Sequence, residues 1–86
     1  MTRYAPDAHD AIQALFDYGD ANLAELVDAM IDILDTDPGD IRVRRFRAHE
    51  PPLWIIKVHV GEQAFWMMWD LDADGEPHIR FAGLVS

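Results

Sequence analysis

Hydrophobic residues along the first half of the chain recur with the spacing of amphipathic helices. Between residues 7 and 18, and again between residues 21 and 36, apolar side chains fall three and four positions apart. Pro6 suits the first turn of a helix, Gly19 suits a helix exit, and either Asp20 or Asn22 can cap the second helix. Because only a short connection separates them, we expect the two helices to pack as antiparallel neighbours.

After Pro38 and Gly39 the period of the pattern changes to two, which is typical of strands. Alternating runs predict strands at Ile41–Phe46, Leu53–Val60, Ala64–Leu71 and His78–Val85, with a short edge strand at Thr2–Tyr4. The sequence therefore predicts one α+β domain over residues 1–86. An acidic antiparallel two-helix hairpin (1–40) would pack on one face of a three- to four-stranded antiparallel sheet (41–86).

Strand alternation assigns one face of this sheet to the helices and leaves the other face open. The helix-facing set is Trp54, Ile56, Val58, Val60, Phe65, Met67, Trp69, Leu71, Ile79 and Phe81. The open set is Ile55, Lys57, His59, Trp66, Met68, Asp70, His78, Arg80, Ala82 and Leu84. This open set is too apolar for a face that meets only water, so we expect a partner to cover it. The candidate partner-binding residues are Ile55, Trp66, Met68 and Leu84.

The charge of the chain is strongly negative and unevenly placed. The net charge is −9, and residues 1–40 alone carry ten acidic residues against one base, whereas residues 41–86 are balanced. An excess of acid argues against broad nucleic-acid binding, which requires Lys and Arg to replace counterions. It fits either a solvated acidic face that confers solubility or a surface that meets a basic partner.

Two local motifs have both a functional and a plain structural interpretation. Residues 70–75 read D-x-D-x-D-G, as at the start of a calcium loop, but Phe81 occupies the position of the bidentate Glu, and a hairpin turn explains the pattern without metal. The basic run at residues 42–47 indicates either an edge strand protected by charge or a contact to phosphate or to a partner's acids, with Arg42 and Arg44 as partner-binding candidates.

Four polar residues of the predicted open face are candidates for catalysis: Lys57, His59, His78 and Arg80. A histidine can act as acid or base near neutral pH, while Lys and Arg can stabilise a phosphate, so together they could cleave RNA through its 2′-hydroxyl. The alternative to a catalytic site is that these four residues are scattered polar side chains around an apolar patch. The chain has no cysteine, and we expect no metal site and no cofactor.

The order of the elements and several local strings resemble the RelE/ParE family of toxins from type II toxin–antitoxin systems. The resemblance covers nearly the whole chain and rests on loose hydrophobic patterns. They are Tyr4 with Ala8, residues 26–34 before Asp37-Pro38, the basic run 41–47, and the strand-like strings 53–58, 66–72 and 79–83. It implies a toxin-type protein with an antitoxin-like partner. Ribosome-dependent members of the family cleave mRNA with basic residues on the open sheet face, whereas the gyrase-inhibiting branch acts by binding.

At the positions that match the family's basic residues, this sequence keeps Lys57 but has Ile55 and Trp66. We therefore expect a RelE/ParE-like protein, degenerate at the catalytic positions, that acts by protein–protein binding to an antitoxin-like protein or as a homodimer. The alternatives are a weak ribonuclease, and a phage or plasmid accessory protein whose acidic face mimics nucleic acid. No signal peptide or membrane span is apparent, so we expect a cytoplasmic protein.

Overall fold

The computed structural model describes residues 1–85, and its N-terminal half forms the two expected helices. Helix α1 spans Pro6–Tyr18 and helix α2 spans Ala21–Thr36. The Asp20 carboxylate accepts a hydrogen bond from the Leu23 backbone N–H at 2.9 Å, which caps the start of α2. The apolar stripe of each helix is buried; it comprises Ala8, Ile12 and Leu15 in α1 and Leu23, Val27, Ile31 and Leu34 in α2.

Five strands form one mixed sheet in the order β1-β5-β4-β3-β2. Their bounds are Arg3–Tyr4 (β1), Phe46–Arg47 (β2), Trp54–Val60 (β3), Gln63–Leu71 (β4) and Pro77–Val85 (β5). The α+β class is confirmed. The short edge strand expected at Thr2–Tyr4 is present as β1 (Arg3–Tyr4), but it runs parallel to β5 and brings the sheet to five strands. The expectation of a three- to four-stranded, wholly antiparallel sheet is therefore wrong. The two helices separate β1 from the rest of the sheet in sequence, and such a crossover permits parallel pairing.

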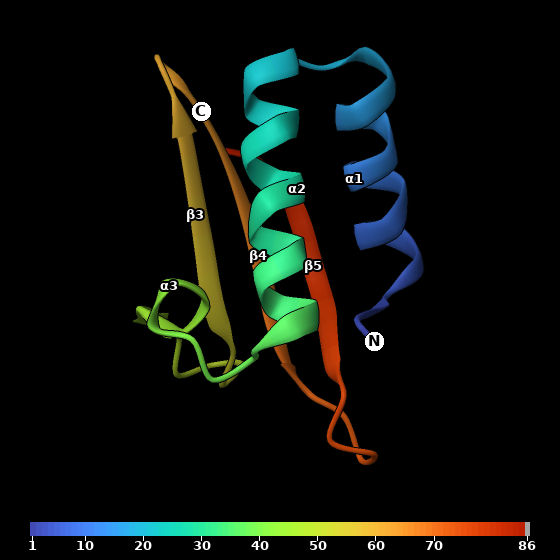
Figure 1. The fold of residues 1–86 in the computed structure, drawn as a ribbon, viewed down its shortest axis with the longest axis vertical. Coiled ribbons are helices and arrows are strands. Elements are labelled where there is room, and N and C mark those ends of the chain that lie inside the picture. Colours follow the sequence, from blue (N-terminus) through green and yellow to red (C-terminus); the bar gives the residue numbers. More distant parts are fainter. Residues whose placement is uncertain (86) are drawn as a thin grey trace.

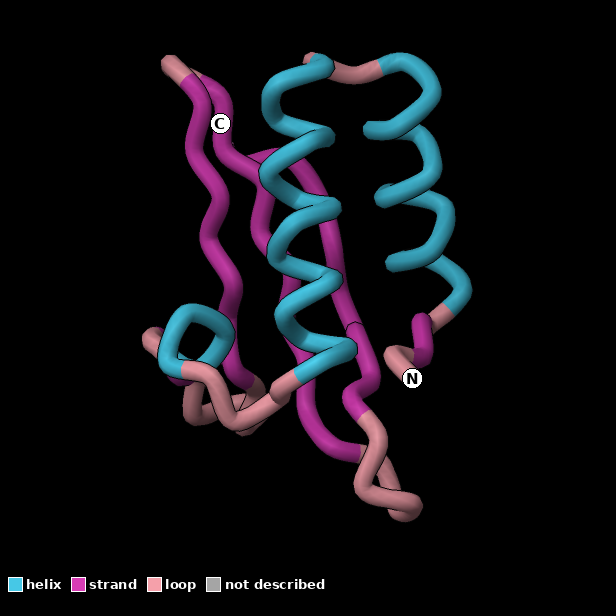
Figure 2. Tube along the Cα trace, viewed as in Figure 1, coloured by secondary structure: helices cyan, strands magenta, loops and turns pink. Residues whose placement is uncertain are grey.

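Both long helices lie on the same face of the sheet, as Figures 1 and 2 show. The core between them is formed on the sheet side by Ile56, Val58, Phe65, Met67, Trp69 and Ile79, none of them more than 5% exposed. The helices are therefore held by burial of apolar surface, and within residues 1–85 no long helix covers the opposite face. None of the described helices combines the length and apolar composition that a membrane span requires.

The segment expected as the first long strand is instead a one-turn helix, α3, at Ile41–Arg44. The Asp40 side chain caps it by accepting the Arg42 backbone N–H at 2.8 Å. Val43 is fully buried, and its carbonyl accepts a hydrogen bond from the Trp69 indole N–H at 2.9 Å. These contacts bend the chain toward the core, so only the two residues of β2 reach the sheet.

A β-bulge in β5 changes the face to which its second half points. Trp69 pairs with Ile79 and Met68 pairs with Phe81, so Arg80 is an extra residue without a partner across the ladder. Because side chains alternate with a period of two, one extra residue exchanges the two faces beyond it. Phe81 is therefore opposite Met68 on the open face and is 57% exposed.

The same bulge places Ala82 and Leu84 on the helix side of the sheet. Ala82 pairs with the buried Met67, and Leu84 pairs with the buried Phe65. The expectation that Phe81 faces the helices while Ala82 and Leu84 lie on the open face is thus wrong. The physical reason for this difference is the extra residue in β5. A strict alternation of side chains along the sequence assumes that no such residue is present.

Candidate functional site

A row of four apolar side chains crosses the open face of the sheet, one from each of four neighbouring strands. Phe46 pairs with Ile55, Ile55 with Met68, and Met68 with Phe81. Phe46 and Phe81, at the two ends of this apolar row, are 40% and 57% exposed. Helices α1 and α2 both lie on the other face of the sheet (Figure 2). Neither of these helices covers the row, whose two central residues Ile55 and Met68 are partly buried. A protein partner could bury this row.

Trp66 lies beside the apolar row and is paired across the ladder with Lys57. The Lys57 ammonium is 4.6 Å from the Trp66 ring centroid and 4.2 Å from that of Phe46, so two aromatic rings hold this charge. The Trp66 indole N–H is buried and has no hydrogen-bond acceptor within the described residues. This orphan donor lies in the middle of the sheet face that carries the apolar row.

Polar side chains flank the apolar row at the end of the sheet near the β4–β5 turn. Asp70 pairs with His78 across the ladder, and its carboxylate accepts a hydrogen bond from the Arg80 Nε at 2.7 Å. Arg3 of β1 pairs with His78 on the outer side. The open face therefore has an apolar centre with a charged margin.

The four residues considered for catalysis are spread over the sheet rather than gathered. His59 lies opposite Ala64, whereas His78 lies opposite Asp70, six positions further along β4. At about 3.4 Å per residue, the two histidines are separated by roughly 20 Å along the strand direction. Lys57 is held by aromatic rings and Arg80 by Asp70, so the structure does not bring the four together around one bond.

Arg42 and Arg44, expected on a strand, lie instead in α3 and are engaged within the chain. The Arg42 guanidinium forms an ion pair with Asp40, with Nη2 and Oδ2 2.8 Å apart. The Arg44 Nε donates to the Pro38 carbonyl, and its guanidinium lies 4.4 Å from the Trp54 ring centroid. The alternation predicted that both side chains project from a strand, and neither does.

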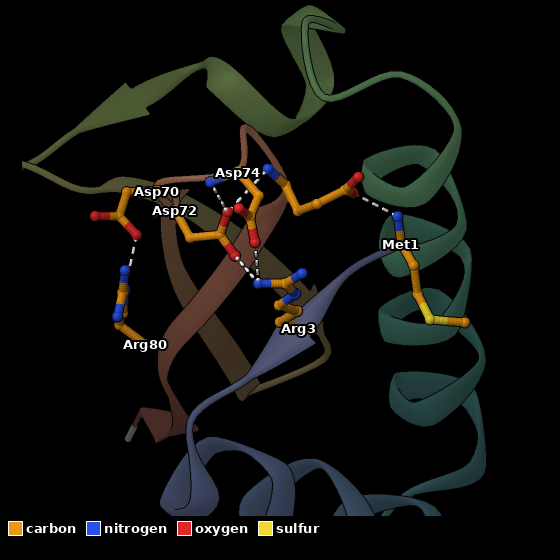
Figure 3. A network of polar contacts seen from close by, with 7 residues as sticks. Met1, Arg3, Asp70, Asp72, Asp74 and Arg80 are labelled. Carbon is orange, nitrogen blue, oxygen red and sulfur yellow. Dashed lines mark hydrogen bonds and ion pairs between the residues drawn. The ribbon is translucent and has the colours of Figure 1, made fainter.

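The acidic D-x-D-x-D-G segment, residues 70–75, ends β4 and continues into the turn before β5. Arg3 of β1 contacts the aspartates of this turn (Figure 3). The Asp72 carboxylate accepts the backbone N–H groups of Asp74 and Glu76 at 2.9 and 3.1 Å. Arg3 Nη1 contacts one carboxylate oxygen of Asp72 and one of Asp74, each at 2.9 Å. Within residues 1–85, no three His, Asp or Glu side chains are grouped to hold a metal ion.

The contacts in this turn shift the pKa values of Asp72 and Arg3. Partial desolvation acts to raise the pKa of Asp72, but the hydrogen bonds from Glu76 and Asp74 and the charge of Arg3 outweigh it and lower the pKa. The hydrogen bond to Asp74 and the charge of Asp72 raise the pKa of Arg3. The ionised form of Asp72 is thus stabilised by the protein's own donors.

The pattern analysis located Ile55, Trp66 and Met68 on the open face, where the register places them, but it missed the two ends of the apolar row. The alternation predicts Phe46 as the last residue of a long strand and Phe81 on the helix-facing side. Phe46 instead lies in the two-residue strand β2, and Phe81 lies on the open face. The local sequence does not indicate that Phe81 points to the open face, because the bulge is visible only in the pairing of β5 with β4. Comparisons of the chain with protein-family models, curated proteins and solved structures found no match.

Proposed function

We propose that the protein acts by binding another protein through the open face of its sheet. The observation that carries the proposal is the uncovered apolar row of Phe46, Ile55, Met68 and Phe81, with Trp66 beside it. Specific interfaces have an apolar, aromatic centre surrounded by a polar rim. Here Lys57 and the Asp70–Arg80 ion pair supply that rim.

The unsatisfied indole of Trp66 supports the same interpretation. A buried polar group without a partner costs free energy, and such groups are uncommon in native proteins. A partner's carbonyl that reaches this N–H would supply the missing acceptor. Tryptophan is enriched at the centres of interfaces because it combines a large apolar area with one donor.

Binding is favoured over RNA cleavage because the basic groups of the open face are already engaged. Lys57 contacts two rings, Arg80 pairs with Asp70, and the two histidines of the face are far apart. Electrostatic stabilisation of a phosphate transition state needs several preorganised donors aimed at one point.

The proposed class is a RelE/ParE-like toxin-type protein that has kept binding and lost the basic cleavage site. A short first strand, two helices on one face and a free opposite face support this proposal. Its partner would be an antitoxin-like protein or a second copy of the chain.

The test is a pair of phenylalanine variants that differ in the face they occupy. Phe81 is exposed on the open face, and Phe16 is 40% exposed on α1 and serves as the matched control. Sedimentation equilibrium of the chain alone measures self-association, and the product of a neighbouring gene is added as the candidate partner. We expect Phe81→Ala and Trp66→Ala each to weaken the complex by about 2 kcal/mol, roughly a thirtyfold rise in Kd.

Phe16→Ala should leave the Kd unchanged. The proposal is wrong if the wild-type chain is monomeric and binds no candidate partner, or if Phe16→Ala weakens the complex as much as Phe81→Ala does.

A further inference from the structure

Within residues 1–85, the outer edge of β5 carries backbone groups that no neighbouring strand uses. The Ile79 carbonyl points toward β1, since it accepts the Ala5 N–H at 2.9 Å. Peptide groups alternate along a strand between its two edges, and the extra residue Arg80 shifts this alternation by one. The N–H and C=O groups of Ala82 and Leu84 therefore point away from β4, while those of Phe81 and Gly83 point toward it.

Strand β1 covers only the first part of this edge. It pairs with His78 and Ile79 alone, so the edge beyond the bulge has no strand beside it in the described part of the chain. From Phe81 to Val85 the edge is uncharged. Exposed apolar edges template pairing with other chains, and natural proteins protect them with charge or cover them. The opposite edge of the sheet, by contrast, carries Lys57 on β3.

A groove beside this edge can receive side chains of an added strand. It has a volume of about 340 Å³ and lies between the second half of α1 and the end of β5. Its walls include Ala11, Ala14 and Tyr18 from the helix and Phe65 and Leu84 from the sheet. A strand placed beside Ala82 and Leu84 would send alternate side chains into this groove.

The helix above the groove sets the charge of what can bind. Asp7, Asp10 and Asp17 are all exposed on α1, and this helix has no Lys or Arg. By helical spacing, Asp7 shares a stripe with the groove residues Ala11 and Ala14, and Asp10 and Asp17 flank that stripe. Two copies of the chain paired edge to edge here would bring like charges together, whereas a basic segment would be attracted.

We propose that an extended segment of a partner protein, apolar at alternate positions and carrying Lys or Arg between them, adds to the sheet as a strand beside β5. The backbone pairs with Ala82 and Leu84, the apolar side chains enter the groove, and the basic side chains meet the acids of α1. This inference rests on the proposed function, because the partner that adds this strand is the same protein that would contact the open face.

The experiment uses a synthetic peptide of alternating Val and Lys as the probe and follows the amides of the protein by NMR. In the free protein we expect the Ala82 and Leu84 amides to exchange rapidly with solvent, and those of Phe81 and Gly83 to be protected. Addition of the peptide should shift the Ala82 and Leu84 signals and slow their exchange at least tenfold. Two control peptides should neither shift these signals nor slow their exchange: one of alternating Val and Glu, and a Val–Lys peptide with an N-methylated backbone.

Two variants at one position separate the backbone from the side chain. Leu84→Pro removes an outward N–H that no strand in the described part of the chain uses, and it should abolish peptide binding. Leu84→Ala keeps this N–H and should retain part of the peptide binding. Trp66→Ala lies on the open face and should leave peptide binding unchanged, so failure of this inference is distinguishable from failure of the proposed function. Unshifted Ala82 and Leu84 amides, or equal binding of the Val–Glu or N-methylated peptide, would overturn the inference.

Discussion

At the scale of single residues, Asp40 shows how one side chain redirects the backbone. Its carboxylate accepts the Arg42 backbone N–H at 2.8 Å and also binds the Arg42 guanidinium through Nε and Nη2. The side-chain hydrogen bonds from Arg42, aided by the backbone hydrogen bond, lower the pKa of Asp40 to about 2. The ionised carboxylate is thus the form that caps α3.

This pKa shift predicts a loss of stability in acid. A carboxyl group whose pKa is lower in the folded than in the unfolded state stabilises the fold above its ordinary pKa of about 4, and this contribution is lost as the pH falls toward about 2. We expect the melting temperature to fall over this interval, and Asp40→Asn to reduce the steepness of the fall. Thermal denaturation followed by circular dichroism between pH 5 and pH 2 measures the melting temperature of both proteins. An identical pH profile in Asp40→Asn would show that the cap contributes nothing.

At the scale of elements, Trp69 joins the sheet to the one-turn helix α3. The Trp69 indole is fully buried on β4 and donates its N–H to the Val43 carbonyl at 2.9 Å. Its ring also packs against Trp54, with the two ring centroids 4.9 Å apart. A four-residue helix has almost no stability of its own, so its position depends on this contact and on the burial of Val43.

We expect Trp69→Phe to destabilise the protein by about 3 kcal/mol. The change leaves a cavity and a buried carbonyl without its donor, and each effect is destabilising. Trp54→Phe is the control, since Trp54 is only partly buried and no donation from its indole occurs within the described residues. Urea denaturation followed by circular dichroism gives both free energies of unfolding; equal losses would argue against a special role for the Val43 hydrogen bond.

The bulge in β5 is a second feature at this scale that strand patterning could not reveal. The alternation of β3 and β4 was predicted correctly because both strands pair without interruption between residues 54 and 69. In β5 the same rule worked up to Ile79 and failed beyond Arg80. Whether a strand contains an extra residue depends on the partner strand, so the faces of Phe81 and Leu84 follow from the assembled sheet.

At the scale of the whole molecule, negative charge is concentrated in the layer of helices. Helices α1 and α2 expose seven acidic side chains and contain no Lys or Arg. Their combined field reaches the sheet: burial raises the pKa of Tyr4, and the charges of Asp35, Asp28 and Asp32 raise it further. Such self-repulsion opposes the compact state.

Screening of this repulsion should stabilise the protein. The Debye length falls from about 10 Å at 0.1 M salt to about 3 Å at 1 M, which weakens interactions among exposed acids. We expect the melting temperature at pH 7 to rise steadily with NaCl, and Asp28→Asn to rise less because one repulsive charge has been removed. Differential scanning calorimetry across a NaCl series measures both slopes. A melting temperature that falls with salt would mean that ion pairs such as Arg3–Asp72 outweigh the repulsion.

The sequence by itself determined the elements whose signals are local. The 3.6-residue period placed α1 and α2, and the short Gly19-Asp20 connection marked the boundary between them. The two-residue period with Gly61 and Gly75 placed the three long strands. Both of these glycines adopt positive φ angles, which explains why turns occur there. These features depend on neighbours in the chain, so they can be inferred without tertiary structure.

Only the tertiary structure decided which way Phe81 points, that residues 41–44 turn into a helix, and that β1 lies parallel to β5. Each outcome depends on a contact between segments far apart in sequence. The run Ile41-Arg42-Val43-Arg44 alternates as a strand would, yet burial of Val43 and the Trp69 hydrogen bond favour a helical turn. The apolar row and the free edge of β5 result from these same contacts, because a period in the sequence fixes alternation but the pairing of strands sets its phase.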